Sequence, residues 1–410
     1  MNLDYLARWA KVKGISLLGT GDFTHPEWFF LLKERLEQAD NGLYQLKDSG
    51  QVENEYLSTI PFSQREVFFI CSSEISFIYS KKGQVRKVHL LVLAPDLDSV
   101  QKLNQRLSGL GNLRADGRPI LGLDAKDFLK IVLDVCPNCL VIPAHIWTPW
   151  FSLFGANSGF DSVEECFEDL TPYIFVLETG LSSDPAMNWR LSSLDRYTLV
   201  SNSDAHSPSK IGREANVFNT ELNYQSIVAA IKEGDPEKFL YTIEFFPEEG
   251  KYHFDGHRNC HVVFSPKQTI ENNYLCPKCG QKLTVGVMHR VELLADREEG
   301  KKPPGKIPFK SLIPLNEIIA EATGKASESK TVWDQYFRLI KNFDNEHKIL
   351  TEVPLEEIEK ISGSKISLGV ENMRKGGVKI IPGHDGVYGK ISLFESKEKP
   401  ESEEQQLKLF

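Results

Sequence analysis

Between residues 15 and 220, short apolar runs alternate with segments whose apolar residues recur with a helical period. The apolar runs lie at 15–19, 67–71, 88–93, 140–143, 174–177 and 197–200, and the helical patterns lie at 26–39, 97–107, 124–135 and 162–170. Strands that are apolar throughout are typical of a parallel sheet whose faces are covered by helices. The sequence therefore predicts an α/β domain, as an open sheet or a barrel, over residues 1–250.

The chain changes character after this domain. Residues 251–310 carry eleven Lys and Arg against six Asp and Glu, although the whole chain has a formal net charge of -9. The run Lys-Lys-Pro-Pro-Gly at 301–305 is typical of a linker. We therefore predict a small module at 251–300, a mostly helical DNA-binding region at 301–394 and a disordered tail at 395–410.

Overall composition excludes several classes of protein. A net charge of -9 excludes a protein that coats nucleic acid over its whole surface, so contacts with phosphates must be local. The sequence has no apolar run of about 18 residues, which predicts no membrane span, and its start does not resemble a signal peptide. Seven cysteines, four of them in Cys-x-x-Cys pairs, favour metal binding over disulfides and predict a cytoplasmic protein, nucleoid-associated if it acts on DNA.

Histidines and acids cluster at strand ends in the first domain. All four histidines before residue 250 except His89 come just after an apolar run, and acids occupy equivalent positions. These residues are His25, His89, His145, His206, Asp22, Glu74, Glu178 and Asp204. Mixed imidazole and carboxylate ligands suit Zn, Mn or Fe, and several of them around one sheet edge indicate a multinuclear hydrolytic site. Any one of them alone is equally well explained as a helix cap.

Four segments resemble the endonuclease Q group of the polymerase-and-histidinol-phosphatase (PHP) family. They read Gly-Thr-Gly-Asp-Phe-Thr-His-Pro-Glu-Trp (19–28), Pro-Ala-His-Ile-Trp-Thr-Pro-Trp-Phe-Ser (143–152), Glu-Thr-Gly-Leu-Ser-Ser-Asp-Pro (178–185) and Ser-Asp-Ala-His-Ser (203–207). The resemblance covers nearly the whole chain. It implies a distorted (β/α)7 barrel with a trinuclear centre of divalent metals (Zn, Mn, Mg or Fe), and nicking of DNA 5′ to deaminated bases and abasic sites.

The resemblance also assigns roles to single residues. Glu74 bridges two metals, and His89 and His145 bind the second. Asp204 binds the first metal, so that Asp204 and Glu74 are the expected catalytic residues. His206 and His25 bind the third, Asp22 lies beside them with its role open, and Glu178 supports a ligand without binding metal.

One departure from the family is plain. The family begins with a strand that carries His-x-His and supplies two ligands of the first metal, and this motif is absent from the sequence. We expect the first barrel strand to be missing because the gene model is truncated; the alternative is a protein that has lost one strand and part of a metal site.

A second metal-binding pattern lies in residues 251–300, here called the Cys/His module. Cys276-x-x-Cys279-Gly has the form of a zinc knuckle, and His257-x-x-Cys260 has the matching half-site spacing. We predict one structural Zn bound by these four residues, with Asp255, His253, His261 and His289 as alternatives to His257. The basic charge of the module predicts DNA contact, although a solvated basic face is also consistent. We assign no ligand to Cys136 or Cys139, because no second pair lies near them.

Two segments are candidates for DNA contact. Trp147, Trp150 and Phe151 crowd the loop after His145, where aromatic rings could stack on a flipped base. Arg374 and Lys375 lie next to glycines whose amides could approach a phosphate. Core packing in the first case and a plain turn in the second are the alternatives.

The chain ends in Gln406-Leu407-Lys408-Leu409-Phe410 after an acidic stretch. This resembles the pentapeptide that binds the bacterial sliding clamp, with Leu409 and Phe410 in an apolar groove and Gln406 fixing the register.

Together these features predict a metal-dependent DNA repair endonuclease that cuts 5′ to uracil, hypoxanthine, xanthine or an abasic site. A small-molecule phosphoesterase on the same barrel is a second hypothesis, although such an enzyme needs neither the module nor the tail. A DNA-binding protein without activity is the third, because His-x-His is absent.

Overall fold

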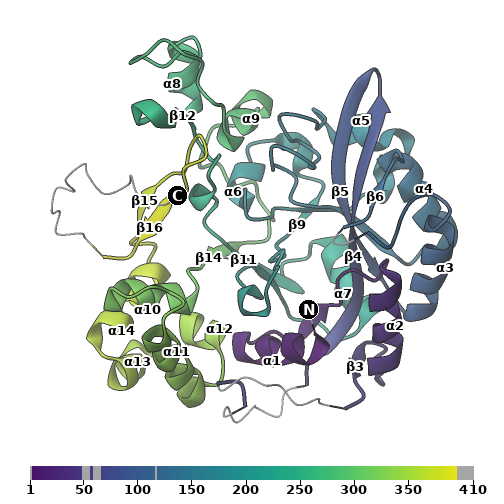
Figure 1. Cartoon of the computed structure of the whole chain (residues 1–410), viewed down its shortest axis with the longest axis horizontal. Helices are drawn as coiled ribbons and strands as arrows, with labels where there is room; N and C mark the ends of the chain where they lie inside the picture. The colour runs from purple at the N-terminus through teal and green to yellow at the C-terminus, as the bar shows by residue number, and fades with distance from the viewer. Residues whose placement is uncertain (1, 49–55, 59–65, 116–117, 395–410) are drawn as a thin grey trace.

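The computed structural model describes residues 2–48, 56–58, 66–115 and 118–394 (Figure 1). The tail, with the predicted clamp-binding residues Gln406, Leu407, Leu409 and Phe410, lies outside the described residues. None of the described helices is both long and apolar enough to cross a bilayer.

The first domain is organised around a long hairpin of β4 (Phe68–Lys81) and β5 (Gln84–Ala94), which extends beyond its neighbours in Figure 1. The strands around it run in the order β2-β3-β4-β5-β7, and β1 and β6 also pair with β4. The bounds of these strands are β1 (Leu17–Gly19), β2 (Leu36–Gln38), β3 (Tyr44–Leu46), β6 (Ile120–Leu121) and β7 (Leu140–Pro143).

The expectation of a parallel sheet needs correction. β1 and β6 are parallel to β4, but β5 is antiparallel to both β4 and β7. The runs at 67–71 and 88–93 are apolar because their strands are largely buried, and burial carries no information about direction. The turn at Lys82 and Gly83, both with positive φ, joins β4 to β5 without a crossover helix.

The α/β class is confirmed, and further strands form smaller sheets. β8 (Val176–Glu178) is parallel to β9 (Thr198–Val200), while β11 (Phe239–Glu244) lies between β10 (Ala215–Phe218) and β14 (Phe309–Ser311). The strands of the described residues are thus divided among several sheets. The closed (β/α)7 barrel expected from the family resemblance remains a prediction.

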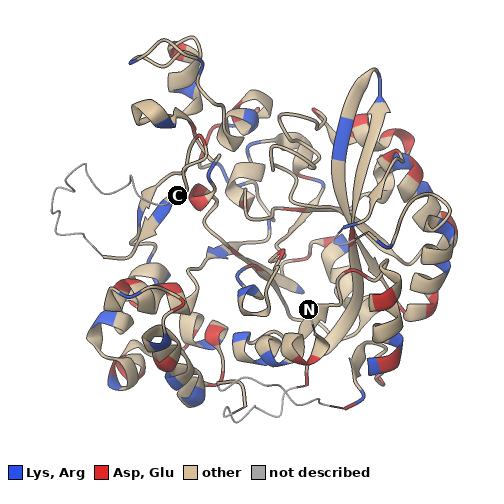
Figure 2. Cartoon of the chain, viewed as in Figure 1, with Lys and Arg blue, Asp and Glu red and all other residues tan. Residues whose placement is uncertain are grey.

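Helices cover the outside of this domain. α3 (Leu97–Leu107) and α4 (Ala125–Val135) lie side by side in Figure 1, each capped by an aspartate whose side chain accepts a backbone hydrogen bond of the first turn. Their outer faces carry both signs of charge (Figure 2). The other helices here are α2 (Pro26–Arg35), α5 (Val163–Phe167), α6 (Pro185–Asn188) and α7 (Tyr224–Glu233).

The first helix, α1 (Leu3–Lys13), packs against the C-terminal helical region. Trp9 contacts the rings of Trp333, Tyr336 and Phe337, and Lys13 forms a buried ion pair with Glu346. The helices of that region are α10 (Leu315–Thr323), α11 (Lys330–Phe343), α12 (Glu346–Thr351), α13 (Leu355–Ser362) and α14 (Ser364–Arg374). The N-terminal helix therefore attaches the first domain to the C-terminal helical region through contacts between residues far apart in the sequence.

The Cys/His module contains β12 (Asp255–His257), β13 (Val262–Phe264), α8 (Pro266–Glu271) and α9 (Val287–Leu294). It lies on the same side of the first domain as the helical region in Figure 1. A hairpin of β15 (Lys379–Ile381) and β16 (Lys390–Ser392) returns to the module, where Phe254 donates a backbone hydrogen bond to Gly383. Gly383 and Gly389 in turn donate to Glu248 and Glu249, just before the module.

Candidate metal centre and nucleic-acid surface

Three of the predicted metal ligands meet at one point, here called the candidate metal centre: Glu74, His89 and His145. Nδ1 of His89 lies 2.7 Å, and Nε2 of His145 3.1 Å, from the same Glu74 carboxylate oxygen, Oε1. One ligand atom from each side chain lies within 4.8 Å of the other two. A carboxylate and two imidazoles at this spacing fit a divalent transition metal.

The β4–β5 register explains how Glu74 and His89 meet. His89 lies opposite Ser76, and Glu74 is two residues before Ser76, so that all three side chains share one face of the hairpin. Oγ of Ser76 lies 2.7 Å from Nε2 of His89, which leaves Nδ1 directed at Glu74. Glu74 is therefore inside a long strand, and not at a strand end as its position in the sequence suggested.

His145 reaches the centre from a strained turn after β7. Its backbone φ is 30°, and Asp22 (44°) and Asp204 (40°) have similar left-handed values. Such values are uncommon outside glycine and concentrate at functional sites. Three predicted site residues that follow three different strands thus share the same strain.

Glu178 and Thr148 hold His145 in place without entering the three-residue group. Oε2 of Glu178 accepts a hydrogen bond from the His145 backbone N–H at 2.7 Å, and Oγ1 of Thr148 lies 3.0 Å from His145 Nδ1. Asn202 donates to the other oxygen of Glu178 at 2.7 Å. Burial raises the pKa of Glu178 to about 7.

The pKa values of the three residues shift in different directions. Burial alone would raise the pKa of Glu74, but its hydrogen bonds with His145 and His89 outweigh burial and hold the pKa well below its usual range. Burial also opposes the protonated form of His145, yet the contact with Glu74 outweighs it and raises the pKa of His145. Burial lowers the pKa of His89. Metal binding at this set should therefore release protons.

Arg118 is a residue of this site that sequence reasoning missed. Its Nη2 lies 2.6 Å from Oδ1 of Asp204, and its Nε lies 3.0 Å from Oε2 of Glu74. Because Arg118 touches both residues, Asp204 is tied to the centre through it. No spacing pattern marks an arginine that lies 86 residues from its partner, so the sequence offered no signal.

The remaining predicted ligands lie around this group. His206 is 81% exposed, with Nε2 3.7 Å from Oδ1 of Asp204. Burial raises the pKa of Asp22, and the charges that act on it include Arg118, Glu74, His25 and His206. Asp22 and His25 therefore lie within electrostatic reach of one another, although among the described residues only Glu74, His89 and His145 form a close group of three at this site.

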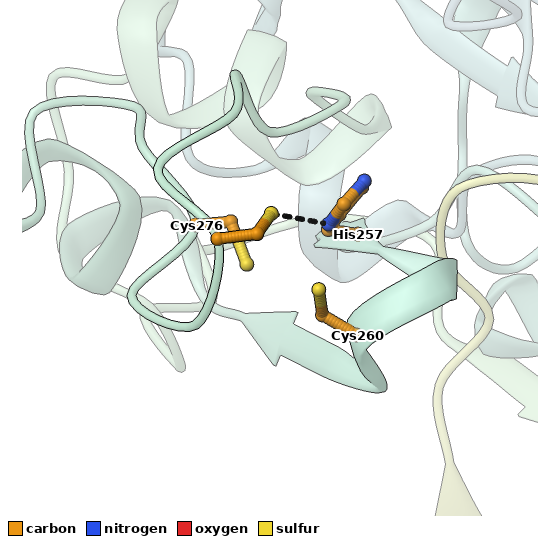
Figure 3. Close-up of side chains that lie close together, drawn as sticks. His257, Cys260 and Cys276 are labelled. Carbon is orange, nitrogen blue, oxygen red and sulfur yellow. Dashed lines mark hydrogen bonds between the residues drawn. The ribbon is translucent and has the colours of Figure 1, made fainter.

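The four predicted zinc ligands do come together (Figure 3). One ligand atom from each of His257, Cys260, Cys276 and Cys279 lies within 4.8 Å of the others, and Nδ1 of His257 is 3.4 Å from Sγ of Cys279. Although burial opposes it, backbone hydrogen bonds from Lys278 and Cys279 lower the pKa of Cys276 to about 6. His257 and Cys260, from the β12–β13 hairpin, thus meet Cys276 and Cys279 from the knuckle turn. One histidine and three cysteines are a ligand set typical of structural zinc.

The alternatives to His257 lie outside this cluster. Asp255 is buried and accepts hydrogen bonds from the Gly286 backbone at 2.7 Å and from His289 Nδ1, also at 2.7 Å. Burial lowers the pKa of His253 to about 4. His289 and Asp255 therefore satisfy one another, which leaves His257 as the histidine of the group.

Two of the predicted DNA contacts are corrected by their placement. Trp147 is only 1% exposed, and its indole N–H donates to Asn188 at 2.8 Å, so it belongs to the core. Arg374 donates to the carbonyls of Ile349, Leu350 and Val353 at the end of α12 and caps that helix. These two side chains are occupied inside the protein.

The other three predicted contacts are more accessible. Trp150 is 50% exposed, while Phe151 is half-buried against the ring of His89, at a centroid distance of 4.8 Å. Lys375, the residue just after α14, is exposed and pairs with Glu371 of that helix at 2.5 Å. Of the aromatic residues predicted to contact DNA, Trp150 is the one that presents an open ring beside the metal centre.

Comparisons with known proteins indicate the family of the chain. Two family models match, one described as PHP-associated over residues 193–236 and one described as the MJ0043 C-terminal domain over residues 314–377. The crystal structure of the lesion-specific endonuclease PfuEndoQ from Pyrococcus furiosus is 30% identical, with a TM-score of 0.82 over 98% of this chain and 93% of that one. Endonuclease Q in complex with a 27-mer duplex containing an abasic lesion is also 30% identical, with a TM-score of 0.79, over 97% and 93% of the two chains.

Two relatives are known by sequence. An uncharacterized protein of Bacillus subtilis, YqxK, is 29% identical over 92% of this chain and 89% of its own length. An uncharacterized protein of Methanocaldococcus jannaschii, MJ0043, is 35% identical over 62% of this chain, and the match spans only 32% of MJ0043. The likeness to PfuEndoQ extends over both the first domain and the C-terminal region.

Proposed function

The chain belongs to the endonuclease Q group of the PHP family, and from this premise we propose that it is a metal-dependent endonuclease of DNA repair. We propose further that it hydrolyses the phosphodiester bond 5′ to uracil, hypoxanthine, xanthine or an abasic site. The observation that carries the proposal is the meeting of Glu74, His89 and His145 on one carboxylate oxygen, with Asp204 joined to them through Arg118.

The proposed ligands are Glu74, His89, His145 and Asp204, with His25, His206 and Asp22 around them. Divalent metals (Zn, Mn, Mg or Fe) held there would polarise the phosphate and activate the attacking water. The chain's own contribution is to fix the ligands. Ser76 and Thr148 each contact one ring nitrogen of a histidine and direct the other nitrogen inward.

An aromatic and basic surface beside the centre supports DNA as the substrate. Trp150 and Tyr252 pack edge to face at 6.3 Å, and Lys251 lies within 6 Å of both the Tyr252 and the Tyr388 rings. Tyr388 is 73% exposed on the β15–β16 hairpin, although that hairpin is fixed by backbone hydrogen bonds to Glu248 and Glu249. A rigid, exposed aromatic with a neighbouring cation suits an unstacked base and its phosphate.

A nicking assay tests the proposal. The chain is incubated with Mn, Mg or Zn and with duplexes that contain uracil, hypoxanthine, xanthine or an abasic site, and the product ends are mapped. We expect nicking 5′ to the lesion by the native chain and by Asp127→Asn, a change on the outer face of α4, and its loss in Asp204→Asn. Release of phosphate from small phosphomonoesters without nicking would favour the phosphoesterase instead, and lesion binding without either activity would favour a DNA-binding protein.

We also propose that the tail binds the bacterial sliding clamp through Gln406, Leu407, Leu409 and Phe410, which would make the enzyme nucleoid-associated in the cytoplasm. The support is the pentapeptide itself. Removal of residues 406–410 should abolish co-purification with the clamp and leave nicking of free duplex unchanged. Clamp binding by the shortened chain would contradict the proposal.

A further inference from the structure

A cavity of about 590 Å³ lies away from the metal centre. Its wall includes Thr198, the first residue of β9, whose backbone N–H donates to Phe175, just before β8. Glu178, which supports His145, ends β8, and the proposed ligand Asp204 follows β9, so both lie at the opposite ends of the same two parallel strands. The loop 301–307 forms the outer wall of the cavity.

Cations line this cavity in excess. The lining residues include Arg196, Lys232, Arg297, Lys301, Lys302 and Lys306, against the two acids Asp195 and Glu233. We call it the basic cavity. Its concentration of positive charge contrasts with the acidic chain as a whole.

Both acids are already neutralised by other contacts. Asp195 is paired with Arg297, and its backbone carbonyl accepts from Lys306. Glu233 is paired with Lys238, outside the cavity, at 2.8 Å. Four of the lining cations, Arg196, Lys232, Lys301 and Lys302, therefore have no carboxylate oxygen within 4.0 Å in the part of the chain that the structure describes.

Aromatic rings hold three of these unpaired cations. Lys302 lies 5.4 Å from the Trp189 ring, Arg196 lies 5.3 Å from the Tyr197 ring, and Lys232 lies 5.0 Å from the Phe175 ring. Cation–π contacts fix the position of a cation without cancelling its charge. Burial also lowers the pKa of Lys232, which has no counter-ion among the described residues, and of Lys306, for which the charge of Asp195 only partly opposes the shift.

We propose that the basic cavity binds a phosphate-bearing ligand of nucleotide size. Its volume falls in the range of small-molecule sites, roughly 300–1,000 Å³. Four unpaired cations around one hollow match the several charges of a di- or triphosphate better than a single carboxylate. The phosphates can belong to a free nucleotide or to a DNA strand, and the position of the cavity away from the metal centre favours the free nucleotide.

Calorimetric titration of the full chain with pyrophosphate and with deoxyadenosine triphosphate tests this. The titrations are done in the Asp204→Asn background with chelator, so that phosphate cannot bind through metal at the catalytic centre. We expect saturable binding that weakens at least tenfold in the double variant Lys232→Gln/Lys302→Gln. Lys238→Gln, which removes a lysine paired outside the cavity, is the matched control and should bind as the parent does.

Because Lys232 is partly buried, Lys301→Glu in the exposed loop provides a second variant that leaves the core untouched, and it should weaken binding as well. Lesion-duplex affinity is measured in parallel. A loss of duplex affinity in the double variant, with no nucleotide binding by the parent, would assign the cavity to the DNA backbone. The proposal would be overturned if parent and variants bound pyrophosphate and deoxyadenosine triphosphate equally well. It would also be overturned if the parent bound neither and the variants kept the duplex affinity of the parent. Nicking by otherwise native chains carrying the lysine changes should persist, so this result is separate from that of the proposed function.

Discussion

Arg118 donates to Asp204 across 2.6 Å, and the same guanidinium contacts Glu74 at 3.0 Å. It thus bridges two carboxylates that the family resemblance assigns to metal binding. Burial of this guanidinium is offset by the two acids, which raise the pKa of Arg118 above its usual value. A fixed positive charge therefore occupies the position between Glu74 and Asp204 where a divalent cation would be attracted.

Replacement of this charge should strengthen metal binding. In Arg118→Gln, Glu74 and Asp204 lose their competing cation, and we expect the affinity for Mn or Zn to rise by about tenfold, or ~1.4 kcal/mol. Calorimetric metal titration of the chelator-treated chain measures this change. The exposed Arg114→Gln, four residues away in sequence, is the control and should titrate as the native chain does.

The same variant separates two roles for Arg118. If the guanidinium also contacts the scissile phosphate, Arg118→Gln should bind metal more tightly and still nick more slowly. Unchanged metal affinity together with unchanged nicking would show that the contacts with Asp204 and Glu74 matter to neither step.

Local spacing explains which parts of the site could be read from the sequence. The four residues of the Cys/His module were predicted correctly as a group, because Cys-x-x-Cys and His-x-x-Cys are turns whose geometry is set within a few residues. His145 and Asp204 were predicted because they follow strands. Glu74 was predicted from an apparent strand end, and His89 owed its role to the family resemblance. Both lie inside long strands whose pairing the apolar pattern does not reveal.

The placement of the other predicted residues depended on tertiary contacts that the sequence pattern does not reveal. Trp147 and Trp150 are three residues apart in one loop, yet one is buried against Asn188 and the other is open to solvent. Arg374 was expected at a phosphate, but it lies where α12 ends and its carbonyls need donors. The class of the fold followed from alternating strands and helices, whereas strand direction depended on the short turn at Lys82 and Gly83.

Gly180 should be intolerant of any side chain. It has φ of 61°, and a Cβ placed on it would lie 2.8 Å from the Cα of His145 and even closer to its Cβ. Gly180→Ala must therefore displace His145, and we expect it to cost about 3 kcal/mol in unfolding free energy and to weaken metal binding. Denaturant unfolding and metal titration measure the two effects.

Gly83→Ala is the matched control for Gly180. Gly83 has a φ of 76° at the tip of the β4–β5 hairpin, with no atom close to the added methyl group. It should show only the cost of left-handed backbone, about 1–2 kcal/mol, and normal metal binding. Equal effects of the two alanines would indicate that contact with His145 is not what makes Gly180 necessary.

Loss of one cysteine thiolate should abolish zinc binding by the Cys/His module. Cys276→Ser is expected to lower the zinc content of the purified chain by one equivalent, because Cys276 is buried among the other three ligands. Plasma emission spectrometry gives the content directly. Cys136→Ser changes a cysteine outside the group and should keep its zinc; zinc retained by both variants would contradict the assignment.

The buried ion pair between α1 and α12 should be needed for stability. Lys13 and Glu346 are each about 4% exposed, and Glu346 also accepts from Tyr336 at 2.5 Å and from the Leu315 backbone. Lys13→Met leaves a carboxylate buried without its cation and should cost about 3–5 kcal/mol. The double variant Lys13→Met/Glu346→Gln should recover most of that loss in urea unfolding. No recovery would mean that packing around Trp9, and not charge, is what Lys13 provides.

Glu214 should make stability fall as pH rises. Both of its oxygens are buried, and among the described residues neither has a hydrogen bond of good geometry. Burial, with the nearby charges of Glu244 and Glu178, raises the pKa of Glu214 well above its ordinary value, and Arg213 and the Phe245 backbone only partly oppose this.

The sign of the effect follows from linkage. The unfolded carboxyl loses its proton near pH 4.3, while the folded one keeps it, so the stabilising contribution is complete below that pH and is lost as pH rises toward the folded pKa. The Gln side chain of Glu214→Gln does not titrate, so the variant does not lose stability in this way as pH rises. The stability of the variant relative to the native chain should therefore increase with pH, by up to ~1.4 kcal/mol per pH unit from about pH 5 upward. Urea unfolding with chelator present measures the slope, and Glu221→Gln, at an exposed site, should show none. A flat difference for Glu214→Gln would mean that Glu214 is ionised in the folded protein.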